Sequence, residues 1–267
     1  MKIKMFQVDA FSDNIFGGNP AAVCILNKWL NEDLMQKIAE ENNLSETAFI
    51  VKKNDEYEIR WFTPEIEVEL CGHATLASAH VLFNYYLSNK NEIILNSKYS
   101  GILKVKKEGD FLILDFPIGE FNKIPNPKEI ISGLGKNPIE SYKGKTDYMF
   151  IYEKQKDIED LNPDFQKLSE SEARGIIVTA KGNEVDFVSR FFAPQCGINE
   201  DPVTGSAHIM LTPYWSNRLN KKEINALQLS KRLGKLKCIL EKERVKISGK
   251  ANTFFIGEIN IPDHYNK

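Results

Sequence analysis

Two short segments hold the residues whose types and spacing could carry proton-transfer chemistry. Residues 71–75 include Cys71 and His73, and residues 200–206 include Asp201. A thiol, an imidazole and a carboxylate can each accept or donate a proton near neutral pH when their surroundings are suitable. Each group comes at the beginning of a run of small residues that predicts the start of a helix. The spacing therefore indicates acid–base chemistry at two helix N-termini.

These two segments are parts of one repeat. At a shift of 130 residues, residues 60–77 align without a gap with residues 190–207. Each stretch predicts a strand, a turn and a helix start, and Cys71 aligns with Asp201. The first amides of a helix lack intrahelical partners, and together with the helix dipole they attract carboxylate or phosphate. Two equivalent helix starts that faced each other would form a site for a small anion.

Small residues at both helix starts would let a ligand approach the backbone closely. The candidate ligand-binding residues are Gly72, Ala74, Thr204, Gly205 and Ser206. Simpler interpretations stay open at this point. Asp201 could be a helix N-cap, Cys71 a small buried apolar residue, and His73 a hydrogen-bonded structural histidine.

A further acidic residue, Glu46, precedes residues 47–51, which predict a buried strand. A carboxylate at the mouth of such a strand is a candidate general acid or base. A capping or surface role is the alternative. Ser45 beside it is a second candidate for ligand binding, and Asn19, after two glycines, is a secondary candidate together with Cys71.

Turn residues and hydrophobic periodicity predict the elements that position these groups. In the first half we expect strands at 2–9, 21–26, 47–51 and 57–62, helices at 31–42 and 73–87, and a meander over 93–116. In the second half we expect strands at 147–152, 175–179 and 184–192, and four more segments between 227 and 259. Helices are expected at 163–172 and 204–215, with Pro213 kinking or ending the second one early. Four prolines within 117–138 predict the crossover between domains.

Length and composition set the class of protein. A chain of 267 residues with a repeat of 130 favours two domains, which we place at 1–120 and 135–267, the last strand being able to pack on the first half. With 42% hydrophobic and 27% charged residues the chain has a globular composition, and a net charge of −2 gives no reason to expect nucleic acid. No apolar run approaches the roughly 18–20 residues that span a bilayer. The N-terminus is too short and polar for a signal peptide, and four cysteines make neither a disulfide framework nor a CxxC zinc motif, so we expect reduced thiols in a cytoplasm.

The chain resembles the PhzF-like family, named for the isomerase of phenazine biosynthesis. The matching segments occur in family order and span nearly the whole chain. They are FQVDAF (6–11), FGGNPAAV (16–23), NLSETAF (43–49), RWFTP (60–64), LCGHATLA (70–77) and EDPVTGSAH (200–208).

The resemblance implies an α+β, diaminopimelate epimerase-like fold. In this fold two pseudo-symmetric halves each wrap a curved, barrel-like sheet around a central helix, and the site lies in the cleft between them. It also implies a homodimer, a small carboxylate substrate, and no metal or organic cofactor. By resemblance Glu46 is the proton shuttle, His73 and Asp201 line the same site, and Ser206 with the amides around Gly72 and Gly205 holds the ligand.

One departure from the epimerase relatives matters. Diaminopimelate epimerase and proline racemase use one cysteine from each half, whereas here Cys71 is matched by Asp201. A two-thiol racemase is therefore not expected. The leading hypothesis is a proton-transfer isomerase with Glu46 as general acid and base. The alternatives are an amino-acid epimerase that uses Cys71 and Asp201, and a small-ligand binding protein without turnover.

Overall fold

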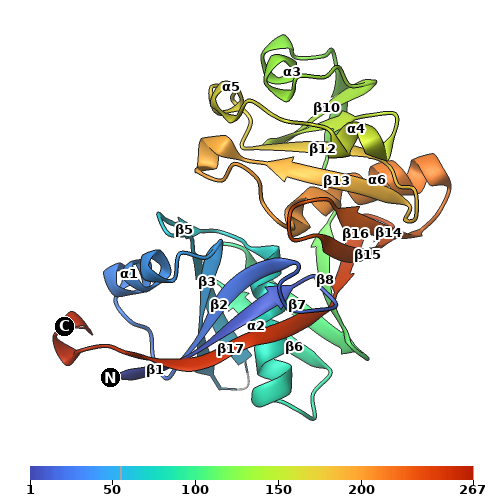
Figure 1. The fold of residues 1–267 in the computed structure, drawn as a ribbon. Coiled ribbons are helices and arrows are strands. Elements are labelled where there is room, and N and C mark those ends of the chain that lie inside the picture. Colours follow the sequence, from blue (N-terminus) through green and yellow to red (C-terminus); the bar gives the residue numbers. More distant parts are fainter. Residues whose placement is uncertain (55, 267) are drawn as a thin grey trace. The chain divides into compact units, whose positions relative to one another are not determined.

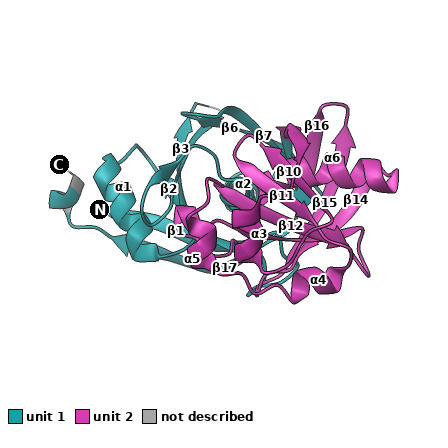
Figure 2. Ribbon diagram, turned by 90° about the horizontal axis from the view of Figure 1, so that it is seen from above, with its two compact units in different colours: residues 1–115, 248–267 teal, residues 116–247 magenta. Residues whose placement is uncertain are grey.

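A computed structural model describes residues 1–54 and 56–266 of the chain. It consists of two compact units, residues 1–115 with 248–267 and residues 116–247 (Figure 2). The sequence-based division was 1–120 and 135–267. Among the described residues, no helix is long and apolar enough to cross a membrane.

The first unit is built on one sheet of mixed direction. Its strands are β1 (Lys2–Ala10), β2 (Asn19–Leu26), β3 (Glu46–Lys53), β4 (Glu56–Phe62), β5 (Glu67–Val68), β6 (Glu92–Ser97), β7 (Gly101–Glu108), β8 (Phe111–Pro117) and β17 (Ala251–Asn260). The main strands follow the order β17-β1-β2-β3-β4-β6-β7-β8, and β5 pairs with β4. Only β2–β3 and β4–β6 are parallel among these pairs.

Two helices cover the two faces of this sheet. Helix α2 (Gly72–Tyr85) runs inside the curve of the strands (Figure 1), and every residue from His73 to Ala79 is buried. A helix that is apolar or small all round is a buried one, so α2 is the central helix of the unit. Helix α1 (Glu32–Asn42) packs Leu34, Met35 and Ile38 on the opposite face, in a core shared with β2 and β3. Asn31 caps α1 by accepting a 2.8 Å hydrogen bond from the Leu34 amide.

The second unit repeats this plan. Its strands are β9 (Phe121–Ile124), β10 (Glu140–Gly144), β11 (Asp147–Ile151), β12 (Gly175–Lys181), β13 (Phe187–Phe192), β14 (Glu223–Gln228), β15 (Gly234–Glu241) and β16 (Arg244–Gly249). Helix α6 (His208–Leu219) is its central helix, buried from Met210 to Ser216. Three short helices, α3 (Lys128–Leu134), α4 (Gln155–Glu159) and α5 (Phe165–Ser169), contribute to a separate core with β11 and β12.

Strand pairing confirms the repeat seen in the sequence. The succession β2-β3-β4-β6-β7 has the pair directions parallel, antiparallel, parallel, antiparallel, and β11-β12-β13-β14-β15 has the same directions. Arg60 on β4 and Arg190 on β13 recur with the same environment. Each guanidinium makes a two-bonded contact with a glutamate, Glu67 or Glu200, and lies over a phenylalanine ring two residues along its own strand.

The duplicated α+β fold is confirmed, although the strand pairs of the described residues form open rows rather than closed barrels. Several details of the second half differ from prediction. The segment 117–138 contains β9 and α3, and the helix expected over 163–172 is limited to α5. Strand β10 and helix α4 were not predicted.

Pro213 does not end the second central helix early, since α6 continues to Leu219. A proline inside a helix leaves the carbonyl four residues earlier without its usual donor. Here that carbonyl belongs to Ile209, and it accepts a 3.0 Å hydrogen bond from the Gly119 amide. The chain outside the helix therefore supplies the donor that the proline removes.

Candidate functional site

A glycine turn positions Asn19, the first residue of β2. Gly18 has φ +62°, and a Cβ at this position would lie 2.0 Å from the Ala10 carbonyl oxygen. Only glycine fits there without moving the end of β1. The turn places Asn19 in the interior of the unit, where its exposure is 0%.

A second turn positions Ser45 and Glu46. Helix α1 ends at Asn43, which has the left-handed φ of 48°, and the Asn42 side chain donates to the Thr47 hydroxyl at 3.1 Å. Glu46 is then the first residue of β3, opposite Ala21 of β2. Its side chain is 13% exposed, so this carboxylate stands at the mouth of a buried strand as predicted.

The start of α2 contributes Cys71 and His73. Cys71 is the N-cap residue in an extended conformation, but its side chain makes no capping hydrogen bond. The Thr75 hydroxyl donates to the Cys71 carbonyl at 2.6 Å and ties down the first turn. His73 follows in that turn with only 5% of its side chain exposed.

These elements bring four of the predicted residues around one imidazole. On one edge of the ring, His73 Nε2 lies 3.0 Å from Glu46 Oε2. On the other edge, His73 Nδ1 lies 3.2 Å from Asn19 Nδ2 and 3.5 Å from Cys71 Sγ. Ser45 extends the chain of contacts by donating to Asn19 Oδ1 at 3.1 Å. Glu46 Oε2 and His73 Nε2 approach to ion-pair distance without hydrogen-bond alignment, and neither atom has a hydrogen-bond partner among the residues that the structure describes.

Electrostatics separate the roles of the thiol and the imidazole. Burial, and next the negative charge of Glu46, raise the pKa of the Cys71 thiol to about 11, so it is protonated at neutral pH. Burial by itself would lower the pKa of His73. The neighbouring anionic groups outweigh burial and raise this pKa well above its usual value, and because the thiol is neutral we attribute the rise to Glu46.

Glu46, Cys71 and His73 are also residue types that bind metal, and their ligand atoms lie within 4.8 Å of one another. However, Glu46 approaches Nε2 and Cys71 approaches Nδ1, on opposite edges of the ring. One ion can bind only one nitrogen of an imidazole, with its other ligands on that same side. This arrangement fits a chain of proton donors and acceptors better than a metal site.

A second cluster forms in the other unit around Asp201. Its carboxylate accepts a hydrogen bond from the Thr204 hydroxyl. Gln228, a buried residue at the end of β14, donates to the Asp201 carbonyl at 2.8 Å and accepts from the Thr204 amide at 2.9 Å. The turn before the central helix is thus tied to the sheet by Gln228, which the sequence did not suggest. Its only signal was a polar residue at a buried position of an otherwise apolar strand face.

The helix start in this cluster differs from the predicted one. A 3₁₀ turn, η2 (Gly205–Ala207), precedes α6, and Thr204 stands before this turn. Asp201 lies three residues further back and does not cap α6. Gly205 is buried and Ser206 half-buried. The expectation that the two clusters face each other across a cleft stays a prediction.

Register identifies what replaces Glu46 in the second unit. Thr47 pairs with Phe62, and Ile176 pairs with Phe192, so Glu46 corresponds to Gly175. A Cβ at Gly175 would meet the Phe191 ring at 2.2 Å. The carboxylate across from Gly175, Asp147, is held by Arg174 through bonds of 2.9 and 2.5 Å. At this strand position the first unit therefore has an acidic residue, Glu46, and the second unit has Gly175.

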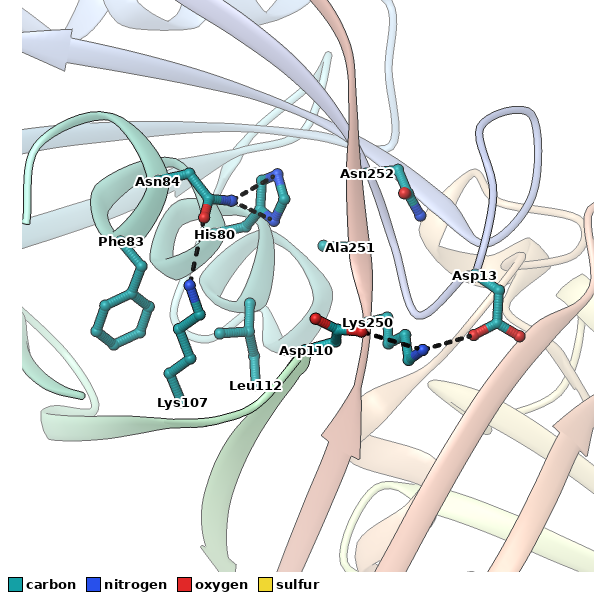
Figure 3. Close-up of a pocket in the computed structure, with 10 residues that line it drawn as sticks. All are labelled: Asp13, His80, Phe83, Asn84, Lys107, Asp110, Leu112, Lys250, Ala251 and Asn252. Carbon is teal, nitrogen blue, oxygen red and sulfur yellow. Dashed lines mark hydrogen bonds and ion pairs between the residues drawn. The ribbon is translucent and has the colours of Figure 1, made fainter. Parts of the chain in front are cut away.

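A pocket of about 320 Å³ lies elsewhere in the first unit, between α2, β7 and the chain around Lys250 (Figure 3). The Lys250 ammonium lies 3.8 Å from Asp13 and 3.6 Å from Asp110, while Lys107 donates to Asn84. None of the predicted site residues lines this pocket. Both lysines of this pocket thus contact other groups of its wall.

Solved structures share this fold across different isomerases. One is a hydroxyproline epimerase from Agrobacterium vitis, with a TM-score of 0.62 and 10% identity, covering 99% of this chain and 94% of that chain. At this identity the likeness concerns the fold. The chain thus has an epimerase-like fold, as predicted.

The family is narrower than the fold. The model of phenazine biosynthesis-like proteins (PhzC-PhzF) matches residues 8–257, and the chain belongs to this family. A crystal structure of a PhzF-family protein from Enterococcus faecalis is 48% identical with a TM-score of 0.94, covering 98% of this chain and all of that one. An uncharacterized isomerase of Pseudomonas aeruginosa is 47% identical over 261 residues, which cover 98% of this chain and all of that protein. Because it belongs to this family and its relatives are named isomerases, the chain is an isomerase.

Proposed function

We propose that the protein moves a proton on a small carboxylate substrate, with Glu46 as the general acid and base and without a metal or organic cofactor. The observation that carries the proposal is the contact of 3.0 Å between Glu46 and His73 at the mouth of a buried strand. A carboxylate that accepts a proton from carbon and returns it to another position needs no cofactor, provided that the developing negative charge is stabilised.

His73 supplies part of that stabilisation. Its Nε2 edge faces the carboxylate, so a proton on this nitrogen can orient Glu46 and compensate for its charge. The amides of the first turn of α2, which no side chain caps, supply donors for a substrate carboxylate. Gly72 is half-buried, so a ligand can approach the backbone there, whereas Ala74 is completely buried. In the proposal Asp201 and Ser206 contribute to substrate binding from the second unit.

The alternative base, Cys71, is less suited to the chemistry. A thiol with a pKa of about 11 has a very small thiolate fraction at neutral pH, and the nearby Glu46 charge opposes its ionisation. An epimerase that uses Cys71 and Asp201 as its two bases would need the opposite environment. This favours the one-base isomerase over the epimerase.

Solvent exchange tests the proposal directly. A panel of small unsaturated and amino-substituted carboxylic acids is incubated with the protein in deuterium oxide, and deuterium incorporation is followed by NMR. An acid that exchanges is then tested with Glu46→Gln, which keeps the side-chain size and removes the base. We expect a loss of exchange of at least about 10³-fold, since a general base contributes typically 10²–10⁴-fold.

Glu108→Gln is the matched control, because Glu108 lies exposed at the end of β7. It should retain full exchange. Retention of exchange in Glu46→Gln, with loss in Cys71→Ala, would replace the proposal with the epimerase. Tight binding of an acid without exchange by the unaltered protein would favour a binding protein. The homodimer and the cytoplasmic location also stay predictions, and light scattering measures the first.

A further inference from the structure

The Nδ1 edge of His73 has an environment that the proposed proton transfer does not by itself require. Asn19 is completely buried, and its Nδ2 lies 3.2 Å from Nδ1. Cys71 Sγ lies 3.5 Å from the same nitrogen. An amide NH₂ group can only donate, and a protonated thiol is a weak donor. Asn19 therefore presents a hydrogen to Nδ1, and the Cys71 thiol can do the same.

A nitrogen that accepts hydrogen bonds carries no proton of its own. In the neutral imidazole exactly one nitrogen is protonated, and the partner of the other nitrogen decides which one. With Nδ1 accepting, the proton of neutral His73 is on Nε2, the nitrogen 3.0 Å from Glu46. The groups on one edge of the ring thus decide what the opposite edge offers to the carboxylate.

Ser45 contacts the other end of the Asn19 amide. Its hydroxyl donates to Asn19 Oδ1 at 3.1 Å, which leaves the NH₂ end of the amide facing His73. A hydroxyl can donate and accept. If the amide turned over, Ser45 could accept from Nδ2 while Oδ1 accepted a proton borne by Nδ1. One pair of side chains can therefore serve neutral His73 and, after rotation of the amide, the imidazolium.

We propose that Asn19, in contact with Ser45, is a positioning residue that keeps Nδ1 of neutral His73 as an acceptor and so places the proton on Nε2, the nitrogen that faces Glu46. Rotation of the Asn19 amide lets the same residue accept from Nδ1 when His73 takes up a second proton. Asn19 acts through His73 and does not contact the reacting carbon. Its importance for catalysis rests on the function proposed above, whereas the protonation pattern of His73 does not.

The nitrogen shifts of the histidine rings test this without a substrate. Two-bond ¹H–¹⁵N correlation spectra of ¹⁵N-labelled protein distinguish a protonated from an unprotonated ring nitrogen. The chain has four histidines, and the signals of His73 are those that disappear in His73→Asn. On titration into the alkaline range, we expect the neutral ring of the unaltered protein to show Nε2 protonated and Nδ1 unprotonated.

Asn19→Asp tests the residue itself. A carboxylate only accepts, so Nδ1 should become protonated and His73 should remain an imidazolium to a pH about one unit higher or more. Asn84→Asp is the matched control, because Asn84 Nδ2 contacts the ring of His80 at 3.1 Å. It should change the signals of His80 and leave those of His73 unchanged.

If Asn19→Asp does not fold, the titration of the unaltered protein still tests the proposal. The proposal is overturned if neutral His73 carries its proton on Nδ1, or if both nitrogens stay protonated throughout the titration. A folded Asn19→Asp protein with an unchanged His73 spectrum would also overturn it. Failure of Glu46→Gln to affect exchange would instead contradict the proposed function and leave this result intact.

Discussion

A buried imidazolium is costly unless a nearby group stabilises its charge. Glu46 does this for His73, because the carboxylate raises the pKa of an imidazole whose burial would lower it. His73 in turn is flanked by Asn19 and Cys71. The site is therefore a short chain of donors and acceptors, in which a change at one residue alters its neighbours.

Thiol labelling measures the protonation of Cys71. With a pKa of about 11 and 6% exposure, Cys71 should react far more slowly with iodoacetamide at neutral pH than the exposed Cys196. Peptide mass spectrometry after short labelling measures both sites in one sample. If Cys71 in the folded protein were labelled as fast as Cys196, the assignment of a protonated, buried thiol would be wrong. Cys71 would then again be a candidate base.

Acid stability depends on His208 in the second central helix. Burial lowers its pKa to about 4, and its Nδ1 lies 2.8 Å from the Thr204 carbonyl. The unfolded chain takes up a proton near pH 6.5, so stability is full above this pH and falls as the pH drops towards 4. The difference corresponds to roughly 3 kcal/mol. Urea unfolding of His208→Gln between these pH values should show a smaller loss than the unaltered protein, and an equal loss would contradict this assignment.

Residue type and position near a helix start suggested Cys71, His73 and Asp201 as candidates, whereas the proton-shuttle role of Glu46 came from the family resemblance. The sequence did not show that Asn19 contacts His73, since the two are separated by 54 residues and meet only through the turn at Gly18. Gln228 was missed for a similar reason, because a strand in the second half brings it back to Asp201.

At the level of elements, both halves contain the same succession. It is a strand whose arginine is bound by a glutamate, then a turn, then a buried helix. Arg60 and Arg190 each fix the start of the turn through a glutamate, and each turn leads into a central helix. The two turns then diverge. The first turn places His73 in the first turn of α2, and the second places Asp201 before a 3₁₀ turn.

The Gly18 turn gives a prediction about one element. Gly18→Ala would place a Cβ 2.0 Å from a backbone oxygen at φ +62°, so we expect a destabilisation of about 2–4 kcal/mol. Gly101→Ala is the control, with φ +68° and no atom within 4 Å of the added Cβ. It should cost about 1 kcal/mol, the conformational penalty alone. Equal losses in thermal unfolding would show that close contact at Gly18 is unimportant.

Local patterns predicted most strands and both central helices, because hydrophobic periodicity and caps act within a few residues. They failed where distant chain supplies the missing partner. Helix α6 passes through Pro213 because the Gly119 amide takes the freed Ile209 carbonyl, and β9 forms in a proline-rich segment because β10 pairs with it. Neither contact has a signal in the local sequence.

At the scale of the whole molecule, the path of the chain decides which residues the first unit needs in order to fold. The C-terminal strand β17 pairs with β1 over almost its whole length, so both ends of the chain belong to the first unit (Figure 1). The second unit is continuous in sequence, from residue 116 to 247. Folding of the first unit therefore needs residues that follow the whole of the second unit in sequence.

Removal of residues 251–267 tests this dependence. It would leave β1 with a free edge and remove a contact of the buried helix α2 with β17. Hydrogen exchange measured by mass spectrometry should speed up in β1 and β2 and stay unchanged in β11 and β12. Loss of protection in both units together would show that the units do not fold separately.

The sequence alone determined the family-typical motifs, the duplicated strand-to-helix unit and the candidate acid–base residues. These depend on residue type and on spacing along the chain, which a sequence records directly. Only the tertiary structure decided that Glu46 and Cys71 approach opposite edges of the His73 ring, that Asn19 and Ser45 complete the cluster, and that Gly175 stands where a second glutamate would be. The reason is physical: burial, pKa and hydrogen-bond direction arise from groups that approach in space after strands far apart in sequence have paired.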